Sequence, residues 1–382
     1  MNDAKTTMPL LALLVVALLG WGVAPAGAAE PADQSATACK NDNPAVAIPA
    51  CSKMIEAGQL KGNDLAWTYN SRGIGYDQQG DHARALADYS KAIEIDPAYG
   101  WAYNNRGAAL NDAGRHDEAI VDLDKALKLD PNNGAAYDNR GLSHYAKGEL
   151  DLALQDYNRA QALNPDDANV LSHRGNTYVD KQLYDRALVD FNRAIKLKPD
   201  FAEAYNNRGV AYQRQNKTTL AMADYDRAIK LDPKYAQAYV NRAVVFSDGK
   251  QYARAVAENT QALRYDPRHV GAWNSRCWNR AILGQLAPAL EDCNQALKLA
   301  PAYLEALDSR GFVNLKLGNY AAAIVDYSAT LKLEPNKASA QFGRGMARVK
   351  SGDAEGGGAD LIAARKADPT IAQKFIEWRY KL

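Results

Sequence analysis

The chain has 382 residues, of which 46 are basic and 45 are acidic, so its formal net charge at pH 7 is +1. A surface that binds nucleic acid needs a marked excess of unpaired basic side chains. We therefore expect no nucleic-acid partner.

The first 28 residues are typical of a secretory signal. Lys5 supplies a positive charge, residues 10–19 form a short apolar core, and Ala26-Gly27-Ala28 is a cleavage site of small residues. The apolar stretch is too short for a comfortable transmembrane helix, although an uncleaved anchor stays an alternative. We predict an exported protein, periplasmic or secreted, with no membrane span after cleavage.

Residues 66–371 consist of nine copies of a 34-residue unit, which indicates a small structure that is repeated and stacked. Small residues recur at position 8 of the unit, alanine at position 20, a large residue at position 24 and usually glycine at position 15. The helical spacing of the apolar and small positions predicts two antiparallel helices, and the glycine suits the left-handed residue that ends the first. Position 32 is Pro97, Pro131, Pro165, Pro199, Pro233, Pro267, Pro301, Pro335 and Pro369.

These residues resemble the tetratricopeptide repeat, whose unit carries small residues, an aromatic residue and a proline in this arrangement. The resemblance covers nearly all of residues 66–371. It implies an all-α fold, a right-handed α-solenoid of nine helix hairpins with capping helices at the N- and C-terminal ends. It also implies that the first helices line the concave inner face.

One departure from the family pattern concerns charged residues. Position 7 holds arginine in all nine units, from Arg72 to Arg344, and position 23 always holds an acid, from Asp88 to Asp360. The two positions lie at nearly the same height on antiparallel helices, which predicts a ladder of arginine–carboxylate pairs within or between repeats. A column of arginines for phosphate or nucleic acid is the alternative, and the matched acids argue against it.

Four cysteines are expected to form two disulfides in an oxidising compartment. Cys277 and Cys293 stand at positions 8 and 24 of one unit, which face each other across the hairpin, and they replace the usual glycine and aromatic residue together. Cys39 and Cys51 would tie the N-terminal segment, residues 29–65, to a capping helix at about 44–57. Four buried free thiols are the alternative for a cytoplasmic chain.

A further helix is expected to cap the C-terminal end, starting near residue 369 and continuing through residues 372–382. A terminal repeat needs such a cover for its apolar side. Three consecutive glycines at 356–358 lie inside the preceding helix, so this end should fray first unless the cap packs closely on it. The apolar face of the cap would consist of Ile371, Phe375, Trp378 and Leu382.

No arrangement of residues points to catalysis. The signal, the caps and the nine repeats leave no segment for a catalytic domain. His82 and His116 share position 17 of adjacent units without a third ligand beside them, which favours two surface histidines over a metal site. We therefore expect no enzyme activity, no cofactor and no metal site.

Polar residues are concentrated at positions 5 and 6 of the first helices, on the expected inner face. An asparagine side chain offers a hydrogen-bond donor and an acceptor together, which suits the backbone of an extended peptide. At position 6 the strip resembles the asparagine ladder in the repeat superhelix of O-linked N-acetylglucosamine transferase. It is predicted to consist of Asn105, Asn139, His173, Asn207 and Asn241 at position 6 and of Asn104, Asn206 and Asn274 at position 5.

Toward the C-terminus the same face becomes apolar. Trp278 and Phe312, both at position 9, are expected to anchor apolar side chains of a bound peptide. For Phe342, Met346 and Val349, contact with the C-terminal helix is a nearly equal alternative.

The sequence thus predicts a non-enzymatic scaffold of the cell envelope or secreted space that holds an extended peptide of a protein partner. A carbohydrate-binding or polysaccharide-export scaffold is one alternative, because Trp67, Trp101 and Trp273 lie near the asparagine-rich strip and could stack on a glycan. A structural protein that associates with itself through its ends is the other.

Overall fold

The computed structural model describes residues 31–380. This part of the chain consists of 21 helices joined by short turns and contains no strand, so the fold is an all-α solenoid. The expected signal segment, residues 1–28, and Leu382 lie outside the described residues. The chain divides into two compact units, residues 1–113 and 114–382.

The first unit contains the N-terminal helices and the first complete hairpin. Helices α1 and α2 both pack against α3, the first helix of that hairpin. The sequence predicted a helix at about 44–57, which is α2, but not the short helix α1 before it. The helices are α1 (Pro31–Cys39), α2 (Pro44–Glu56), α3 (Gly62–Gln78), α4 (His82–Ile95) and α5 (Gly100–Asp112).

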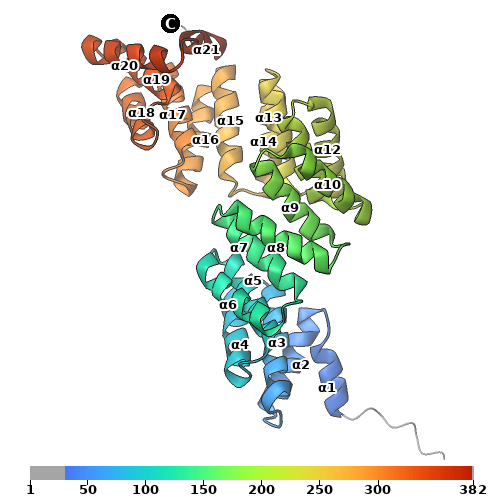
Figure 1. Cartoon of the computed structure of the whole chain (residues 1–382). Helices are drawn as coiled ribbons and strands as arrows, with labels where there is room; N and C mark the ends of the chain where they lie inside the picture. The colour runs from blue at the N-terminus through green and yellow to red at the C-terminus, as the bar shows by residue number, and fades with distance from the viewer. Residues whose placement is uncertain (1–30, 381–382) are drawn as a thin grey trace, which may run out of the picture. The chain divides into compact units, whose positions relative to one another are not determined.

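The second unit contains seven complete hairpins and the C-terminal helix. Within each hairpin the two helices run antiparallel, and successive hairpins stack side by side (Figure 1). Its helices are α6 (His116–Leu129), α7 (Gly134–Ala146), α8 (Leu150–Leu163), α9 (Ala168–Asp180), α10 (Tyr184–Leu197), α11 (Ala202–Arg214), α12 (Thr218–Leu231), α13 (Ala236–Asp248), α14 (Tyr252–Tyr265), α15 (Val270–Leu283), α16 (Leu286–Leu299), α17 (Leu304–Leu317), α18 (Tyr320–Leu333), α19 (Ala338–Lys350), α20 (Ala354–Ala367) and α21 (Ile371–Glu377). None of the described helices is long and apolar enough to cross a membrane.

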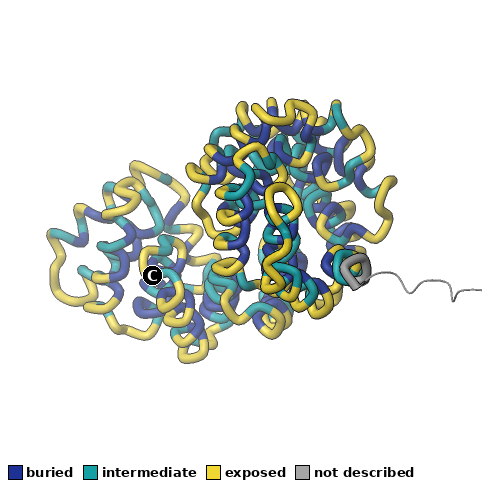
Figure 2. The backbone as a smooth tube through the Cα atoms, turned by 90° about the horizontal axis from the view of Figure 1, so that it is seen from below, coloured by how far each residue is buried: buried dark blue, intermediate teal, exposed yellow. Residues whose placement is uncertain are grey.

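Burial follows this arrangement, with buried residues on the helix sides that face each other and exposed residues in the turns and on the outer sides (Figure 2). Glycine at position 8 lets the first helix rest on the ring at position 24. In the hairpin of α11 and α12, a Cβ added to Gly209 would lie 2.6 Å from Cε1 of the buried Tyr225. Gly175 and Phe191 have the same relation in α9 and α10.

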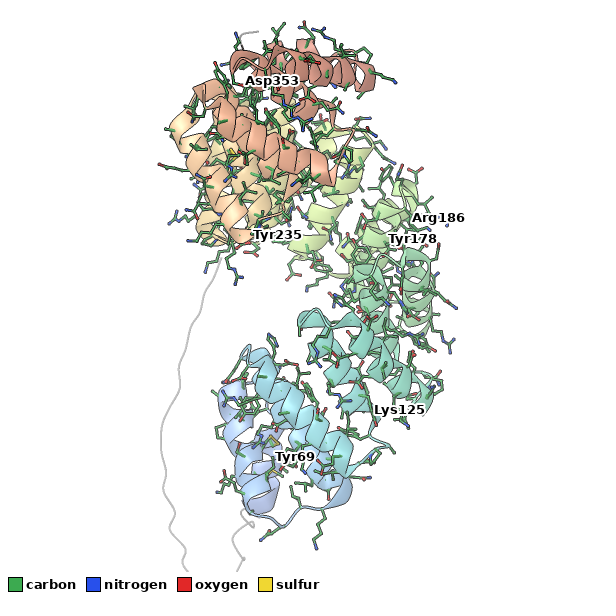
Figure 3. The ribbon with its side chains drawn as sticks, turned by 90° about the vertical axis from the view of Figure 1, so that its left-hand side faces the viewer. Tyr69, Lys125, Tyr178, Arg186, Tyr235 and Asp353 are labelled. Atoms are coloured by element: carbon green, nitrogen blue, oxygen red, sulfur yellow. A yellow bond between two sulfur atoms is a disulfide. The ribbon has the colours of Figure 1, made fainter. Side chains whose placement is uncertain are left out.

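The turn after each first helix holds its position 15 residue in the left-handed region. Glycine provides this conformation at most copies, for example Gly148 with φ of 76°. Gln182 and Lys250 adopt it with φ of 60° and 58°, although neither is glycine. Near this turn Arg186 of α10 lies over the ring of Tyr178 of α9, 5.9 Å from its centroid (Figure 3).

The arginine at position 7 joins the two helices of its hairpin and the preceding hairpin. Arg208, on α11, binds Asp224 of α12 through Nε and Nη2 at 2.8 and 2.7 Å, and its Nη1 donates to Asn192 of α10 at 2.7 Å. Eight of these pairs have nitrogen–oxygen distances between 2.6 and 2.8 Å: Arg72–Asp88, Arg140–Asp156, Arg174–Asp190, Arg208–Asp224, Arg242–Glu258, Arg276–Asp292, Arg310–Asp326 and Arg344–Asp360.

Both predicted cysteine pairs form disulfides. Cys277 of α15 and Cys293 of α16 have Cα atoms 5.4 Å apart and occupy the places that glycine and the aromatic ring take in other hairpins. Cys39 and Cys51, with Cα atoms 4.9 Å apart, join the end of α1 to α2. The N-terminal helices are therefore fastened to each other covalently.

The C-terminal helix α21 packs on α19 and α20, as expected for a cap. Its own residues Ile371 and Phe375 are buried in this contact. The glycines of α20 permit a close approach to α19, because a Cβ added to Gly357 would lie 2.7 Å from the backbone oxygen of Gly345. Gly358 faces open space.

Candidate functional site

The face formed by the first helices of the second unit contains a hollow of about 260 Å³. Four consecutive first helices, α7, α9, α11 and α13, contribute to it. Three of the predicted strip residues, Asn206, Asn207 and Asn241, meet there. The complete lining is Tyr145, Asn176, Val179, Asp180, Asn206, Asn207, Val210, Gln237 and Asn241.

Four amide side chains in this hollow form a continuous chain of hydrogen bonds. Gln237 Nε2 donates to Asn241 Oδ1 at 2.9 Å, and Asn241 Nδ2 donates to Asn206 Oδ1 at 2.8 Å. Asn206 Nδ2 donates in turn to Asn207 Oδ1 at 3.0 Å. The chain joins α13 to α11, so it fixes the position of one hairpin on the next.

The direction of this amide chain is set by His269. The backbone N–H of Ala272 donates to His269 Nδ1 at 3.1 Å, and Nε2 lies 3.0 Å from Gln237 Oε1. A backbone N–H can only donate, so Nδ1 accepts, and Nε2 carries the proton and donates to Gln237. Because Gln237 accepts through Oε1, its Nε2 group donates to Asn241, and Asn241 and Asn206 each accept through Oδ1 and donate through Nδ2 in the same direction along the chain. The chain ends at the buried Nδ2 group of Asn207, which has no partner among the described residues.

The hydrogen bond from position 6 to position 5 of the preceding repeat, seen between Asn241 and Asn206, recurs two repeats earlier but is missing in the repeat between them. His173 Nδ1 lies 2.9 Å from Asp138 Oδ1. Burial disfavours the charged imidazolium, but the hydrogen bond and the negative charge of Asp138 outweigh it, so the pKa of His173 is raised. Asn207 would need a partner at Ser172, whose buried hydroxyl also lacks one in the described chain. Serine is shorter than asparagine, so the ladder is interrupted there.

The predicted strip therefore has two layers. The position 5 residues Asn104 and Asn206 are only 5% and 2% exposed and lie between first helices instead of widening the open face. In the first unit Asn104 donates to Asn105, and Asn105 donates to Asn70, each at 3.0 Å. Asn274 is partly buried, and its Oδ1 has no described partner. The position 6 residues of the predicted strip, including Asn139, are all partly exposed.

Asn176 of α9 also lines the hollow, and the sequence reasoning missed it. It stands at position 9, where the other eight repeats carry apolar residues such as Val210 and Val244. Its side-chain amide has no hydrogen-bond partner among the described residues, in contrast to Asn206 and Asn241. A single polar residue at an otherwise apolar repeat position was the signal that could have identified it.

The remaining lining adds one charge and an apolar contact. Asp180, one helical turn after Asn176, accepts a hydrogen bond from the hydroxyl of Tyr145 at 2.6 Å. Burial is the main cause that raises the pKa of Tyr145, so this hydroxyl stays protonated. Val179 and Val210 provide apolar surface. Amide, carboxylate and apolar groups side by side can bind a peptide group and an adjoining side chain.

The two aromatic residues predicted as peptide anchors lie beneath the C-terminal helix. Phe312 is 1% exposed, and its ring centroid is 5.6 Å from that of Phe375. Trp278 meets Trp378 edge-on, with centroids 4.9 Å apart. In this structure both contact α21 instead of an open groove. No group of three or more histidine, cysteine or acidic residues in the described chain could hold a metal ion.

Comparison with protein families gives several matches along the repeats. Models described as "TPR repeat" match residues 141–182 and 175–216. Models described as "Tetratricopeptide repeat" match residues 66–99, 100–133, 202–235, 224–257 and 313–370. Together these matches cover more than half of the chain. No curated protein matches it.

Solved structures share the fold at low sequence identity. A tetratricopeptide-repeat protein from Parabacteroides merdae is 19% identical with a TM-score of 0.54, and the match covers 65% of this chain and 98% of that one. The APC/C hetero-tetramer Cut9–Hcn1 is 14% identical with a TM-score of 0.57, covering 88% and 82%. YrrB, described as having an unusual peptide-binding site, is 28% identical but has a TM-score of 0.38, covering 50% and 95%.

Proposed function

Because the chain belongs to the tetratricopeptide-repeat family, we propose that it is a non-enzymatic scaffold that holds an extended peptide of a partner protein on its first-helix face. The hollow between α7 and α13 is the proposed binding site. The ladder of bonded amides keeps the helices in place, and the free groups around it bind the ligand. Rigid presentation of this kind lowers the entropic cost of binding.

The main support for this proposal is the position of Asn176. Its amide lines the hollow and is not used by any other described residue. An amide can donate to a peptide carbonyl and accept from a peptide N–H at the same time, so it binds backbone irrespective of the side chains. Asp180 and the two valines would then favour particular side chains beside it.

We further propose that the protein works in the periplasm or outside the cell. Two disulfides suit an oxidising compartment. The expected signal at residues 1–28 suits export as well. Detection of the protein in the periplasmic or extracellular fraction of its source cells would support this location, and detection only in the cytoplasm would refute it.

The binding proposal can be tested with a phage library of random decapeptides. The wild-type protein should enrich a peptide family, and Asn176→Val should bind those peptides at least tenfold more weakly. Valine occupies the same position in the next two repeats, so this variant should keep its helical circular dichroism and its melting temperature. Asn336→Ala, at an exposed turn, is the matched control and should bind like the wild type.

Each outcome of this selection has a definite meaning. Equal binding by wild type and Asn176→Val would remove the hollow from the mechanism. If no peptide is enriched but a polysaccharide array is bound, the glycan scaffold replaces the peptide scaffold. A molecular mass that rises with concentration, without any bound ligand, would favour the self-associating alternative.

A further inference from the structure

The C-terminal helix α21 lies across the first-helix face and not only at the end of the stack. Phe375 contacts Phe312 of α17 and Phe342 of α19, with ring centroids 5.6 and 4.6 Å apart. Trp378 reaches α15, two hairpins away, where it meets Trp278. We name Trp278, Phe312 and Phe342 the aromatic cradle. They stand at positions 9, 9 and 5, and these same positions line the hollow at α9 and α11.

Lysine side chains of the repeats bind α21 through polar contacts of the kind that a peptide-binding surface makes with a peptide. Lys316 Nζ donates to the backbone oxygen of Trp378 at 3.5 Å and to that of Ala281 at 2.7 Å. Lys250, in the turn after α13, pairs with Glu377 at 3.2 Å across 127 residues of sequence. A backbone carbonyl and an acidic side chain are thus bound by lysines of the repeat face.

Three features make α21 an imperfect occupant of the cradle. The helix has seven residues, too few to be stable without its contacts. Arg379, just after it, has φ of 60°, a strained conformation for a residue other than glycine. Arg379 also places its charge in the same hollow as Lys316 and Lys350, a space of about 430 Å³. Three positively charged side chains therefore line one hollow, where an acidic side chain would be bound more favourably than Arg379.

We propose that the aromatic cradle is a second docking site and that α21 occupies it as an exchangeable plug. The ligand is an amphipathic helical segment of a partner protein. It carries two aromatic residues three positions apart and an acidic residue shortly after them. This inference rests on the proposed role of the first-helix face as a peptide-binding surface. The spacing of three comes from Phe375 and Trp378, which project from the same side of the helix. The acid would take the place of Arg379 between Lys316 and Lys350.

A peptide exchange experiment on the full-length protein tests this proposal. The probe is a fluorescent synthetic peptide of residues 369–380, and binding is followed by fluorescence polarisation. The tethered α21 is present at a high effective concentration, so the wild type should bind the probe weakly. The double variant Phe375→Ala/Trp378→Ala should bind it at least tenfold more tightly. Ile376→Ala changes a side chain of the same helix that is 49% exposed, and should behave like the wild type.

A second probe tests the charge assignment. The same peptide carrying Arg379→Glu should bind the double variant about three- to tenfold more tightly than the native peptide, and the difference should shrink as salt is raised. Equal or weaker binding of this probe would overturn the predicted acidic ligand. A folded double variant that does not bind the native probe would overturn the docking site itself.

A milder variant avoids the risk that the double variant fails to fold. Lys250 and Glu377 are 67% and 47% exposed in their side chains, so Glu377→Lys should leave the fold intact. It should weaken the plug and raise probe affinity about twofold at low salt, and the swap Lys250→Glu/Glu377→Lys should reverse the gain. An unchanged affinity in both would contradict an exchangeable plug. Because the probe comes from this chain, failure here leaves the library test of the α7–α13 hollow unaffected.

Discussion

At the residue scale, the fit of a glycine against a ring decides how closely the two helices of a hairpin approach. Gly209→Ala places a methyl group where Tyr225 leaves no room. The clash costs about 1–3 kcal/mol, and the higher helix propensity of alanine returns at most about 1 kcal/mol. We expect a net loss of about 1–2 kcal/mol in the free energy of unfolding, measured by urea denaturation.

Gly358→Ala is the matched control for this prediction. It also replaces a glycine inside a helix, but its Cβ would meet nothing within 4 Å. Helix propensity alone then acts, and we expect a gain of about 0.5–1 kcal/mol. Two changes of the same sign would show that ring contact at position 8 is not the deciding factor.

A second residue-scale prediction concerns the carboxyl group of Asp308. Burial raises its pKa to about 6, and only one of its oxygens has a described hydrogen bond, from Ser339 at 2.9 Å. A raised carboxyl pKa stabilises the folded state at low pH, and this contribution is lost as pH rises from about 4 to about 6. Asp308→Asn keeps an uncharged side chain, so it should be about 1–3 kcal/mol more stable than the wild type at pH 7 and nearly equal to it at pH 4.

Denaturant titrations at several pH values between 4 and 7 check this expectation. Asp200→Asn removes an exposed carboxyl group from a turn and should show no such pH-dependent difference. If the Asp308→Asn advantage is constant over this range, the charge of Asp308 is not its cause.

At the element scale, the hairpin of α15 and α16 uses a disulfide where five other hairpins use glycine and a ring. Cys277→Gly/Cys293→Phe would recreate the arrangement of Gly175 and Phe191. The residue facing the ring end, at position 12, is apolar in both hairpins, so a phenylalanine leaves no hydroxyl unsatisfied. We expect this variant to retain most of the wild-type stability and to lose the effect of reducing agents on this hairpin.

The comparison variant is Cys277→Ser/Cys293→Ser, which removes the cross-link without refilling the space. Closing a loop of 16 residues contributes about 3 kcal/mol, so this variant should be less stable by about that amount. Thermal unfolding with and without reductant measures both effects. Equal melting temperatures for the two double variants would mean that ring packing cannot replace the disulfide.

At the scale of the whole molecule, the position 7 arginines make the stack of hairpins cooperative. Arg208 is bound by Asp224 of its own hairpin and by Asn192 of the preceding one. Arg208→Met leaves the buried Asp224 without its partner, and we expect a loss of about 3–5 kcal/mol. Coupling between neighbours is also weakened, so the urea transition of the second unit should become broader.

Arg193→Met is the control for this effect. Arg193 pairs with Asp166 at 3.0 Å, but both side chains are largely exposed, so its loss should change stability by less than about 0.5 kcal/mol. An Arg208→Met protein with the same transition width as Arg193→Met would show that these arginines do not couple the hairpins.

The repeat pattern by itself determined the helices of the nine hairpins, their pairing and the Cys277–Cys293 disulfide, because each of these depends on residues at fixed short distances along the chain. Cys277 and Cys293 could be paired because they replace a known contact within one hairpin. The position 6 asparagines could be placed on a polar face for the same reason. The isolated Asn176 was visible in the sequence as well, but only after the other copies of position 9 were aligned with it.

Only the tertiary structure decided which asparagines are free and what covers the aromatic cradle. The direction of the amide chain depends on His269, which lies at the start of α15, 32 residues from the Gln237 that it orients. The burial of Asn206 depends on the neighbouring repeat. The position of α21 across three first helices depends on contacts such as Lys250 with Glu377, 127 residues apart. A periodic sequence specifies neighbours within and between adjacent repeats, whereas contacts that cross several repeats follow from how the stack brings distant side chains together.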